Sequence, residues 1–175
     1  MTLGTANAVL ERWNALDPAE AVRQVLPCCG SHAWADSLAA RRPFASSAQL
    51  FAASDDIWSG LPEREWQEAF DSHPRIGQQH AKAASAESLK WSSHEQREAM
   101  SQDHAMRAAL AEGNRRYEAK FGRIFIVCAS GKSAAEILGI LERRMENPAD
   151  VELREAAEQQ RQITQVRLRR WLGVE

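Results

Sequence analysis

The chain has 175 residues and a formal net charge of −2, which argues against a strongly basic protein that neutralises many nucleic-acid phosphates. Hydrophobic residues make up 44% and charged residues 26%, ordinary values for a globular protein, so we exclude a disordered chain and a disulfide-stapled miniprotein. At this length we expect one domain spanning residues 1–175.

Cysteine usage and hydropathy indicate the compartment. The three cysteines, Cys28, Cys29 and Cys128, form no Cys-x-x-Cys pair, which favours a reducing environment. The N-terminal segment lacks the apolar core of a secretory signal, and no apolar run approaches the roughly 20 residues that a membrane span needs. We therefore expect a soluble, cytoplasmic protein without a membrane partner.

Helix-start signals follow one another along the chain. Asp17 precedes Pro18, and Glu20 stands three residues after Asp17, which is a capping pattern. The proline residues that follow predict breaks between several short helices, near Pro27, Pro43 and Pro62.

Later helix starts have the same form. Ser92 and Ser133 each precede a glutamate by three residues, and Asn147 precedes Pro148 at the start of a long final helix. After Ser133 and Asn147, apolar residues recur every three to four positions, as in amphipathic helices. The polar, small residues 81–90 are predicted to form a mobile loop.

Only residues 124–128, with the sequence Ile-Phe-Ile-Val-Cys, have the pattern of an extended segment. This apolar run lies between Gly122 and Gly131, and a single run of this length cannot build a sheet. We expect a buried extended link between two long helices. The predicted fold is all-α: a single-domain bundle of about eight to nine helices with one short extended buried segment.

His73 is the first candidate for catalysis. Pro74 keeps residue 73 out of the helical conformation, and Gly77 permits a left-handed turn, so the imidazole is held at a helix end. A histidine with the ordinary pKa near 6.5 can act as acid or base at neutral pH. The commonplace alternative is a solvent-exposed or capping histidine in a turn.

Ser92, Glu95 and Gln96 form the second candidate. The commonplace explanation is a capping box of Ser92 and Glu95 at a helix start. The functional alternative is that this helix start presents backbone N–H groups and a positive dipole end to an anion. Glu95 would then be a site carboxylate and Gln96 a neutral hydrogen-bonding group.

Residues 125–129 are the third candidate. Core packing explains them, but their backbone N–H and C=O groups, unpaired in any sheet, could instead bind a flat polar ligand. Gly131-Lys132-Ser133 resembles the end of a phosphate-binding loop, yet Ile126 stands where that loop needs its first glycine. Cys128 has the apolar neighbours of a buried, inert thiol. We find no metal-binding pattern of His, Cys, Asp or Glu and expect no metal.

These motifs, in this order and at these intervals, resemble the OHCU decarboxylase family, which decarboxylates 2-oxo-4-hydroxy-4-carboxy-5-ureidoimidazoline (OHCU) in uric acid degradation. The resemblance covers about residues 10–172. It rests on His73-Pro74-Arg75-Ile76-Gly77, Ser92-x-x-Glu95-Gln96, Tyr117-x-x-Lys120-Phe121-Gly122-x-x-Phe125-Ile126-Val127-Cys128-Ala129 and Arg167-Leu168-x-x-Trp171-Leu172. It implies an all-helical fold, usually a homodimer, with a small anionic substrate, no cofactor and the S enantiomer of allantoin as product.

The resemblance also implies roles for individual residues. His73 would be the main acid/base and proton donor, with Glu95 as its partner in proton handling. Arg167 would neutralise the substrate carboxylate. The remaining substrate-binding residues would be Pro74, Ser92, Gln96, Phe125, Ile126, Val127, Cys128 and Ala129. Many family members carry an arginine after Ala129; this chain has Ser130 there, which leaves Lys132 and Arg123 as candidates for nearby positive charge.

The chemistry of the substrate agrees with a site that lacks a cofactor, because a C=N bond beside the carboxylate-bearing carbon accepts the electrons released with CO₂. One alternative is a hydrolase or isomerase of a related ureide, with the same His/Glu pair activating water. Another is a non-catalytic interaction module whose final helix pairs its basic and acidic residues with a partner. A solvated face with ion pairs three and four residues apart explains those charges equally well; they are Arg161, Arg167, Arg169, Arg170, Glu152, Glu155 and Glu158.

Overall fold

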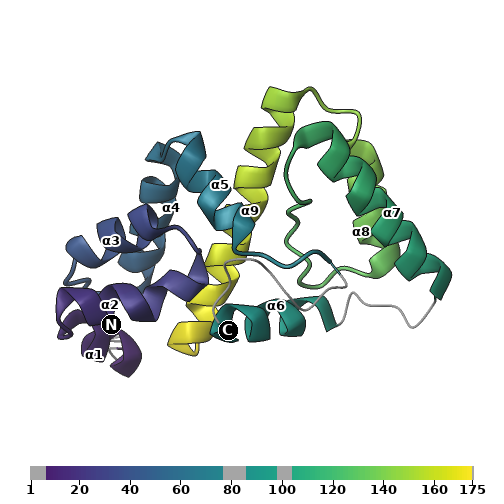
Figure 1. The fold of residues 1–175 in the computed structure, drawn as a ribbon. Coiled ribbons are helices and arrows are strands. Elements are labelled where there is room, and N and C mark those ends of the chain that lie inside the picture. Colours follow the sequence, from purple (N-terminus) through teal and green to yellow (C-terminus); the bar gives the residue numbers. More distant parts are fainter. Residues whose placement is uncertain (1–6, 77–85, 98–103, 175) are drawn as a thin grey trace.

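The computed structural model describes residues 7–76, 86–97 and 104–174, and these contain nine α-helices, one 3₁₀ helix and no β-strand (Figure 1). The predicted all-α fold is therefore confirmed. The elements are α1 Ala8–Asn14, α2 Pro18–Val25, η1 Leu26–Cys28, α3 His32–Ala40, α4 Ser47–Gly60, α5 Glu63–Asp71, α6 Ala86–Arg97, α7 His104–Phe121, α8 Ala134–Arg144 and α9 Ala149–Leu172.

Two of the predicted helix starts are confirmed in detail. The Asp17 side chain accepts the backbone N–H of Glu20 at 3.0 Å and caps α2, with Pro18 as the first helical residue. At α8, Ser133 accepts the N–H of Glu136, whose carboxylate in turn accepts the N–H of Ser133 at 2.6 Å. Both helices begin at these residues because the caps satisfy backbone donors that the first turn leaves unpaired.

The predicted helix start at Ser92 is wrong. α6 begins at Ala86, so Ser92 lies inside the helix, and neither a capping box with Glu95 nor an anion-binding helix end exists there. The helix is held along its side instead, since Ser88 and Ser92 both accept hydrogen bonds from Arg167 of α9. A serine three residues before a glutamate is a local pattern that also occurs in helix interiors.

Two other expectations need adjustment. α9 begins at Ala149 directly after Pro148, as predicted, but the Asn147 side chain donates to Glu152 at 2.9 Å instead of capping the helix. The predicted loop at residues 81–90 is shorter, because residues 86–90 belong to α6; residues 81–85 lie outside the described part of the chain.

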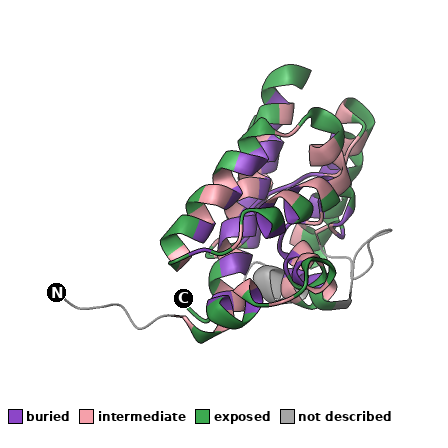
Figure 2. Ribbon diagram, turned by 90° about the vertical axis from the view of Figure 1, so that its left-hand side faces the viewer, coloured by how far each residue is buried: buried purple, intermediate pink, exposed green. Residues whose placement is uncertain are grey.

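α9 is the central element of the fold. Its 24 residues span about 36 Å at 1.5 Å per residue. In Figure 1, α1–α5 lie on one side of α9, and the α7–α8 pair lies on the other side. Figure 2 shows buried residues along the faces where helices meet and exposed residues on the outer faces. α9 thereby brings together residues from both halves of the chain.

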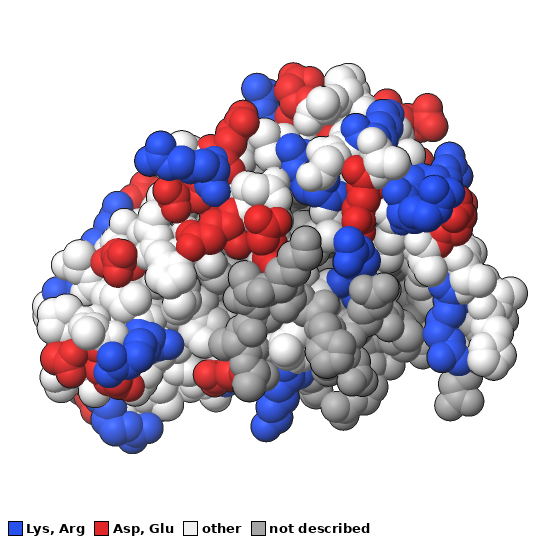
Figure 3. Space-filling view, in the orientation of Figure 1, with Lys and Arg blue, Asp and Glu red and all other residues white. Residues whose placement is uncertain are grey.

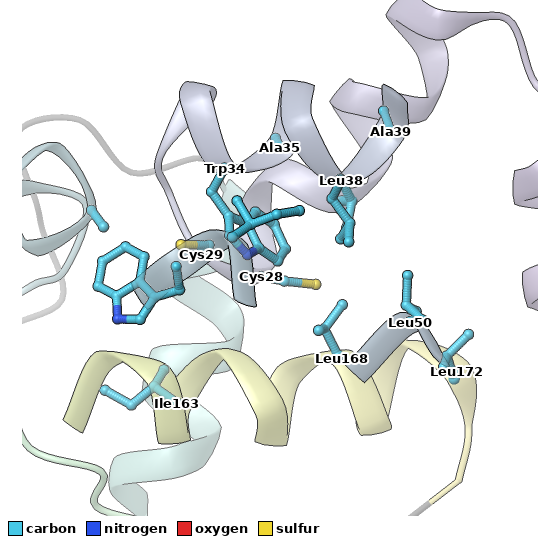
Figure 4. Close-up of a cluster of buried hydrophobic side chains, with 14 of the residues drawn as sticks. Cys28, Cys29, Trp34, Ala35, Leu38, Ala39, Leu50, Ile163, Leu168 and Leu172 are labelled. Atoms are coloured by element: carbon cyan, nitrogen blue, oxygen red, sulfur yellow. The ribbon is translucent and has the colours of Figure 1, made fainter. Parts of the chain in front are cut away.

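The larger hydrophobic core fills the space between α9 and the N-terminal helices. Figure 4 shows Leu168 of α9 directed toward Cys28 and Leu38, all of which are completely buried. Trp34, also fully buried, donates its indole N–H to the Ser54 hydroxyl at 3.2 Å, so its polar atom is satisfied within this core.

The extended segment between α7 and α8 connects two hydrophobic cores. Phe125, Val127 and Ala129 pack in a smaller core with α7 and α8, whereas Ile126 and Cys128 belong to the larger one. The alternation arises because successive side chains of an extended chain point to opposite sides. The predicted buried extended link between two helices is confirmed.

The surface carries charges of both signs. On the face shown in Figure 3, basic and acidic side chains intermingle, in keeping with the small net charge. In the part of the chain that the structure describes, no helix combines the length and the hydropathy that a membrane crossing requires.

Candidate functional site

A small pocket lies where the turn after α5, helix α6, the extended segment and α9 meet. Its cavity volume is about 30 Å³, and the space between its lining residues is about 350 Å³ when the open solvent at its mouth is included. Its lining comes from all four segments: His73, Pro74, Ile76, Ser92, Phe125, Ile126, Val127, Ala129 and Ile163. The fold therefore brings His73, Ser92 and the extended segment, which are distant along the chain, to one place.

His73 occupies the turn that follows α5. Its backbone N–H donates to the Phe70 carbonyl at 3.1 Å, while Pro74 directs the chain away from the helix and is itself buried. The imidazole is partly buried, and its Nε2 lies 2.6 Å from Oε1 of Gln160 on α9. The predicted turn is present at His73 and Pro74, while Gly77 lies outside the described residues, and the solvent-exposed alternative is wrong.

The contacts of Gln160 define the protonation of His73. The Gln160 side chain is fully buried, and its Nε2 donates to the carbonyl of Cys29 at 3.4 Å and to Thr164 Oγ1 at 3.2 Å. A carbonyl oxygen can only accept, so the amide orientation is set and its Oε1 faces His73. The imidazole must then donate through Nε2–H, which leaves Nδ1 as the unprotonated nitrogen.

The surroundings keep His73 neutral. Burial and, to a smaller extent, the positive charge of Arg167 lower the pKa of His73 to about 3, and this value includes the opposing effect of the hydrogen bond with Gln160. The ordinary pKa near 6.5 that the sequence suggests is therefore wrong in this structure. At neutral pH the imidazole is therefore unprotonated before a substrate binds.

Arg167 lies completely buried on α9. It donates from Nη2 to Ser92 at 2.8 Å and from Nη1 to the Ser88 hydroxyl at 3.3 Å and the Pro27 carbonyl at 3.2 Å. It thus stands behind Ser92 and does not line the pocket itself. The solvated face or partner-binding face that was the alternative for Arg167 is wrong.

The backbone of the extended segment is paired at alternate residues. Arg144 donates to the Ile126 carbonyl at 2.6 Å, the Cys128 N–H donates to Gln159 at 2.9 Å, and Lys132 donates to the Cys128 carbonyl at 2.8 Å. The expectation that this backbone is unpaired throughout is therefore wrong at residues 126 and 128. Cys128 does not line the pocket.

Phe125 and Val127 differ from their neighbours. Their backbone N–H and C=O groups have no hydrogen-bond partner among the described residues. In an extended chain the N–H and C=O groups of successive residues point to opposite edges, so the edge opposite the contacts of residues 126 and 128 stays available. Val127 therefore offers the pocket one donor and one acceptor.

Lys132 and Arg123 have different surroundings. Lys132 binds the Cys128 carbonyl, so it supports the extended segment from outside the pocket. Nε and Nη1 of Arg123 are buried and lack a partner among the described residues, and Arg123 does not line the pocket either. Neither residue brings its charge into the pocket wall.

A buried ion pair beneath the extended segment was missed by sequence reasoning. Arg144 donates to Glu152 from Nε at 2.9 Å and from Nη2 at 2.5 Å, and its guanidinium lies 4.6 Å from the centre of the Phe125 ring. The Tyr117 hydroxyl also donates to Glu152, and burial raises the pKa of that hydroxyl. Both the partner-binding face and its alternative, a solvated face, are wrong for Glu152, since its side chain is completely buried.

Gln160 was also missed, although α9 carries a signal for it. Ala156, Gln160, Ile163 and Arg167 follow one another at intervals of four, three and four, which places them on one face of a helix. Ala156 and Ile163 are buried, so Gln160 and Arg167 are polar residues on an apolar stripe. Buried polar groups need partners, and this pattern alone would have indicated interacting residues elsewhere.

The remaining predicted residues lie on α6. Glu95 and Gln96 follow Ser92 by one helical turn, but their side chains lie outside the described residues. Across the ranges that the structure describes, no group of three or more His, Cys, Asp or Glu side chains gathers as a metal site would require.

The chain resembles known proteins over most of its length. Residues 14–169 match the profile of the OHCU decarboxylase family. The uric acid degradation bifunctional protein TTL of Arabidopsis thaliana is 37% identical over 142 residues, which are 81% of this chain and 44% of that protein. This chain thus spans less than half the length of that curated relative.

Two solved structures resemble the fold. The crystal structure of OHCU decarboxylase in the presence of (S)-allantoin has a TM-score of 0.74 and 35% identity, covering 85% of this chain and 96% of that one. The crystal structure of (S)-allantoin synthase has a TM-score of 0.69 at 17% identity, covering 93% of this chain and 53% of that one, and shares the fold alone. From the match over residues 14–169, we conclude that this chain belongs to the OHCU decarboxylase family.

Proposed function

We propose that this protein decarboxylates OHCU to (S)-allantoin and CO₂. The observation that carries the proposal is the neutral His73, held by Gln160 in the wall of a small pocket, in a chain that belongs to this family. Val127 also lines the pocket, and its backbone groups, which have no partner among the described residues, suit a flat ring with amide-like edges.

The reaction needs a base before it needs an acid. When the carboxylate leaves as CO₂, its bonding electrons form a bond between the hydroxyl-bearing carbon and its neighbour, and the C=N pair moves onto nitrogen, which takes a proton from solvent. The resulting enol must lose its hydroxyl proton and gain a proton on the neighbouring carbon. A neutral imidazole can accept the hydroxyl proton and deliver it to one face of the neighbouring carbon.

His73 meets this requirement because its low pKa leaves it unprotonated before the substrate binds. The substrate carboxylate brings a negative charge that offsets the field of Arg167, and this raises the affinity of His73 for a proton during the reaction. Delivery of the proton from a fixed turn supplies it to one face only, which explains a single enantiomer of product.

The other residues of the pocket orient the ring. Val127 provides a backbone donor and acceptor, Phe125 and Pro74 provide apolar walls, and Ser92 provides a hydroxyl that Arg167 polarises. Glu95 and Gln96 lie one helical turn beyond Ser92 on α6, and we assign them proton handling and binding of the ureido group.

The test is decarboxylation of freshly generated OHCU by the wild type and by His73→Asn. CO₂ release measures turnover, and circular dichroism measures the excess of (S)-allantoin. We expect a loss of about 10²–10⁴-fold in turnover with His73→Asn. The exposed His104 on α7 provides the control, and His104→Asn should keep wild-type activity.

Wild-type turnover by His73→Asn would show that His73 is not the base. A wild type that consumes a related ureide without releasing CO₂ would instead favour a hydrolase or isomerase. We further propose that the protein works in the cytoplasm as a homodimer and needs no added cofactor, since the substrate accepts its own electrons. Light scattering and activity after exhaustive dialysis test the last two points.

A further inference from the structure

We propose that Gln160 is a positioning residue that holds His73 in the tautomer protonated at Nε2, so that Nδ1 is the nitrogen that exchanges protons with the substrate. This inference rests on the proposed decarboxylation, and it adds a residue that the sequence motifs do not include. It assigns a specific atom of His73 to the chemistry.

The geometry of Gln160 supports this role. Its Oε1 lies 2.6 Å from His73 Nε2, and its Nε2 is engaged with the Cys29 carbonyl and the Thr164 hydroxyl. The side chain is completely buried on a central helix. Rotation of the amide would turn its Oε1 toward the Cys29 carbonyl, so that two acceptors would face each other. The amide therefore presents an acceptor, and only an acceptor, to the imidazole.

The other ring nitrogen of His73, Nδ1, is free to accept a proton from a substrate. Nδ1 of His73 has no hydrogen-bond partner among the described residues, and His73 lines the pocket. With Nε2–H donating to Gln160, the lone pair that can accept a substrate proton is on Nδ1. The ring cannot exchange the two nitrogens without breaking the contact with Gln160.

An amide at this position has a different effect from a carboxylate. A carboxylate opposite an imidazole stabilises the charged imidazolium, as in a catalytic triad, and raises the histidine pKa. Gln160 fixes the tautomer without adding a negative charge, so His73 stays neutral. Arg167 on α9 adds a positive charge that acts in the same direction, and the neighbouring Cys29 thiol stays protonated because burial raises its pKa to about 12.

The first experiment reads the tautomer directly. The measurement is an NMR spectrum of the ¹⁵N-labelled wild type at pH 7, in which the His73 signals are assigned by comparison with His73→Asn. His73 should show a protonated Nε2 and an unprotonated Nδ1. A proton found on Nδ1 overturns the proposal. This measurement needs no turnover, so it separates the inference from the proposed function: a locked tautomer in a protein that does not decarboxylate OHCU contradicts only the function.

The second experiment changes the acceptor. Gln160→Glu should raise the His73 pKa by at least about two pH units, since the carboxylate favours the imidazolium, and should move the acid limb of kcat to higher pH by the same amount. Gln160→Met removes the acceptor and keeps the shape; kcat should fall about 10- to 100-fold with little change in KM, the range seen for partners that orient metal-binding histidines.

Gln162→Glu is the matched control, because Gln162 lies on the same helix and contacts Glu158 instead of His73. It adds the same charge and should leave the acid limb and the His73 titration unchanged. An unchanged acid limb in Gln160→Glu, or an unchanged kcat in Gln160→Met, overturns the proposal. If Gln160→Glu does not fold, the wild-type spectrum and Gln160→Met still decide the question.

Discussion

Arg167 donates from Nη2 to the hydroxyl of Ser92 at 2.8 Å, although the two residues stand 75 positions apart. The contact joins α9 to α6 at the edge of the pocket and places a completely buried positive charge behind a residue of the pocket wall. Through this contact, a residue that does not line the pocket can affect the chemistry in it.

The contact between Arg167 and Ser92 can be removed from the serine side. Ser92→Ala leaves a buried guanidinium N–H without this acceptor, so the free energy of unfolding should fall by about 1–3 kcal/mol. Urea denaturation measures the change. Ser59→Ala removes an exposed hydroxyl that bonds the Asp56 carbonyl, and it should stay within about 0.5 kcal/mol of wild type. Equal stability of the two variants would contradict the importance of the Arg167 contact.

The charge of Arg167 should be visible in the titration of His73. Arg167→Met removes a positive charge that lowers the His73 pKa, so that pKa should rise, and KM for the anionic substrate should increase. Arg167→Lys keeps a positive charge. Its His73 pKa and its KM should both lie between those of Arg167→Met and those of the wild type. NMR titration and steady-state kinetics provide the two readouts. A His73 pKa that is the same in all three proteins would refute an electrostatic role for Arg167.

The low pKa of His73 makes stability depend on pH. The folded protein holds His73 neutral to about pH 3, whereas the unfolded chain binds a proton below about pH 6.5. Between these pH values the unfolded state binds more protons than the folded state. The contribution of His73 to the free energy of unfolding therefore falls as pH decreases, by up to about 1.4 kcal/mol per pH unit.

His73→Asn should therefore show a shallower loss of stability than wild type between pH 6.5 and pH 4. Urea midpoints at several pH values measure the slope, and His104→Asn on the exposed start of α7 should keep the wild-type slope. Parallel slopes for wild type and His73→Asn would mean that His73 titrates normally in the folded protein.

The buried pair of Arg144 and Glu152 supports the extended segment that lines the pocket. Arg144→Met or Glu152→Gln alone disrupts the pair and, in each case, leaves a buried charge without its partner, at a cost of about 3–5 kcal/mol. The double variant should lose less than the sum of the two. A thermodynamic cycle from chemical denaturation measures the coupling. Additive losses would show that the two residues do not act as a pair.

Glu95 offers a clear separation of structural and catalytic roles. α6 starts at Ala86, so Glu95 is not a capping residue, and Glu95→Gln should keep the helix content and melting temperature of wild type. Its kcat should decrease if Glu95 handles protons in the reaction. Glu87→Gln, in the first turn of the same helix, is the control with unchanged kcat. A loss of stability at full activity would assign Glu95 a structural role.

Much of the architecture could be predicted because it depends on short-range patterns. The caps at Asp17 and Ser133 act within one helical turn, and the extended link at residues 124–128 is recognisable from its β-branched, apolar run. The Ser92 pattern misled for the same reason: a local motif does not reveal that α6 begins six residues earlier or that Ser92 contacts Arg167.

The sequence by itself determined that the chain is helical, that one buried extended link joins two helices, and that His73 sits in a turn at the end of a helix, since each depends on neighbouring residues. Only the tertiary structure decided that Gln160, 87 positions from His73, holds its imidazole, and that Arg144 and Glu152 meet beneath Phe125. The tertiary structure also made His73 a neutral base, because its pKa depends on burial and on the distant charge of Arg167, which no local pattern contains.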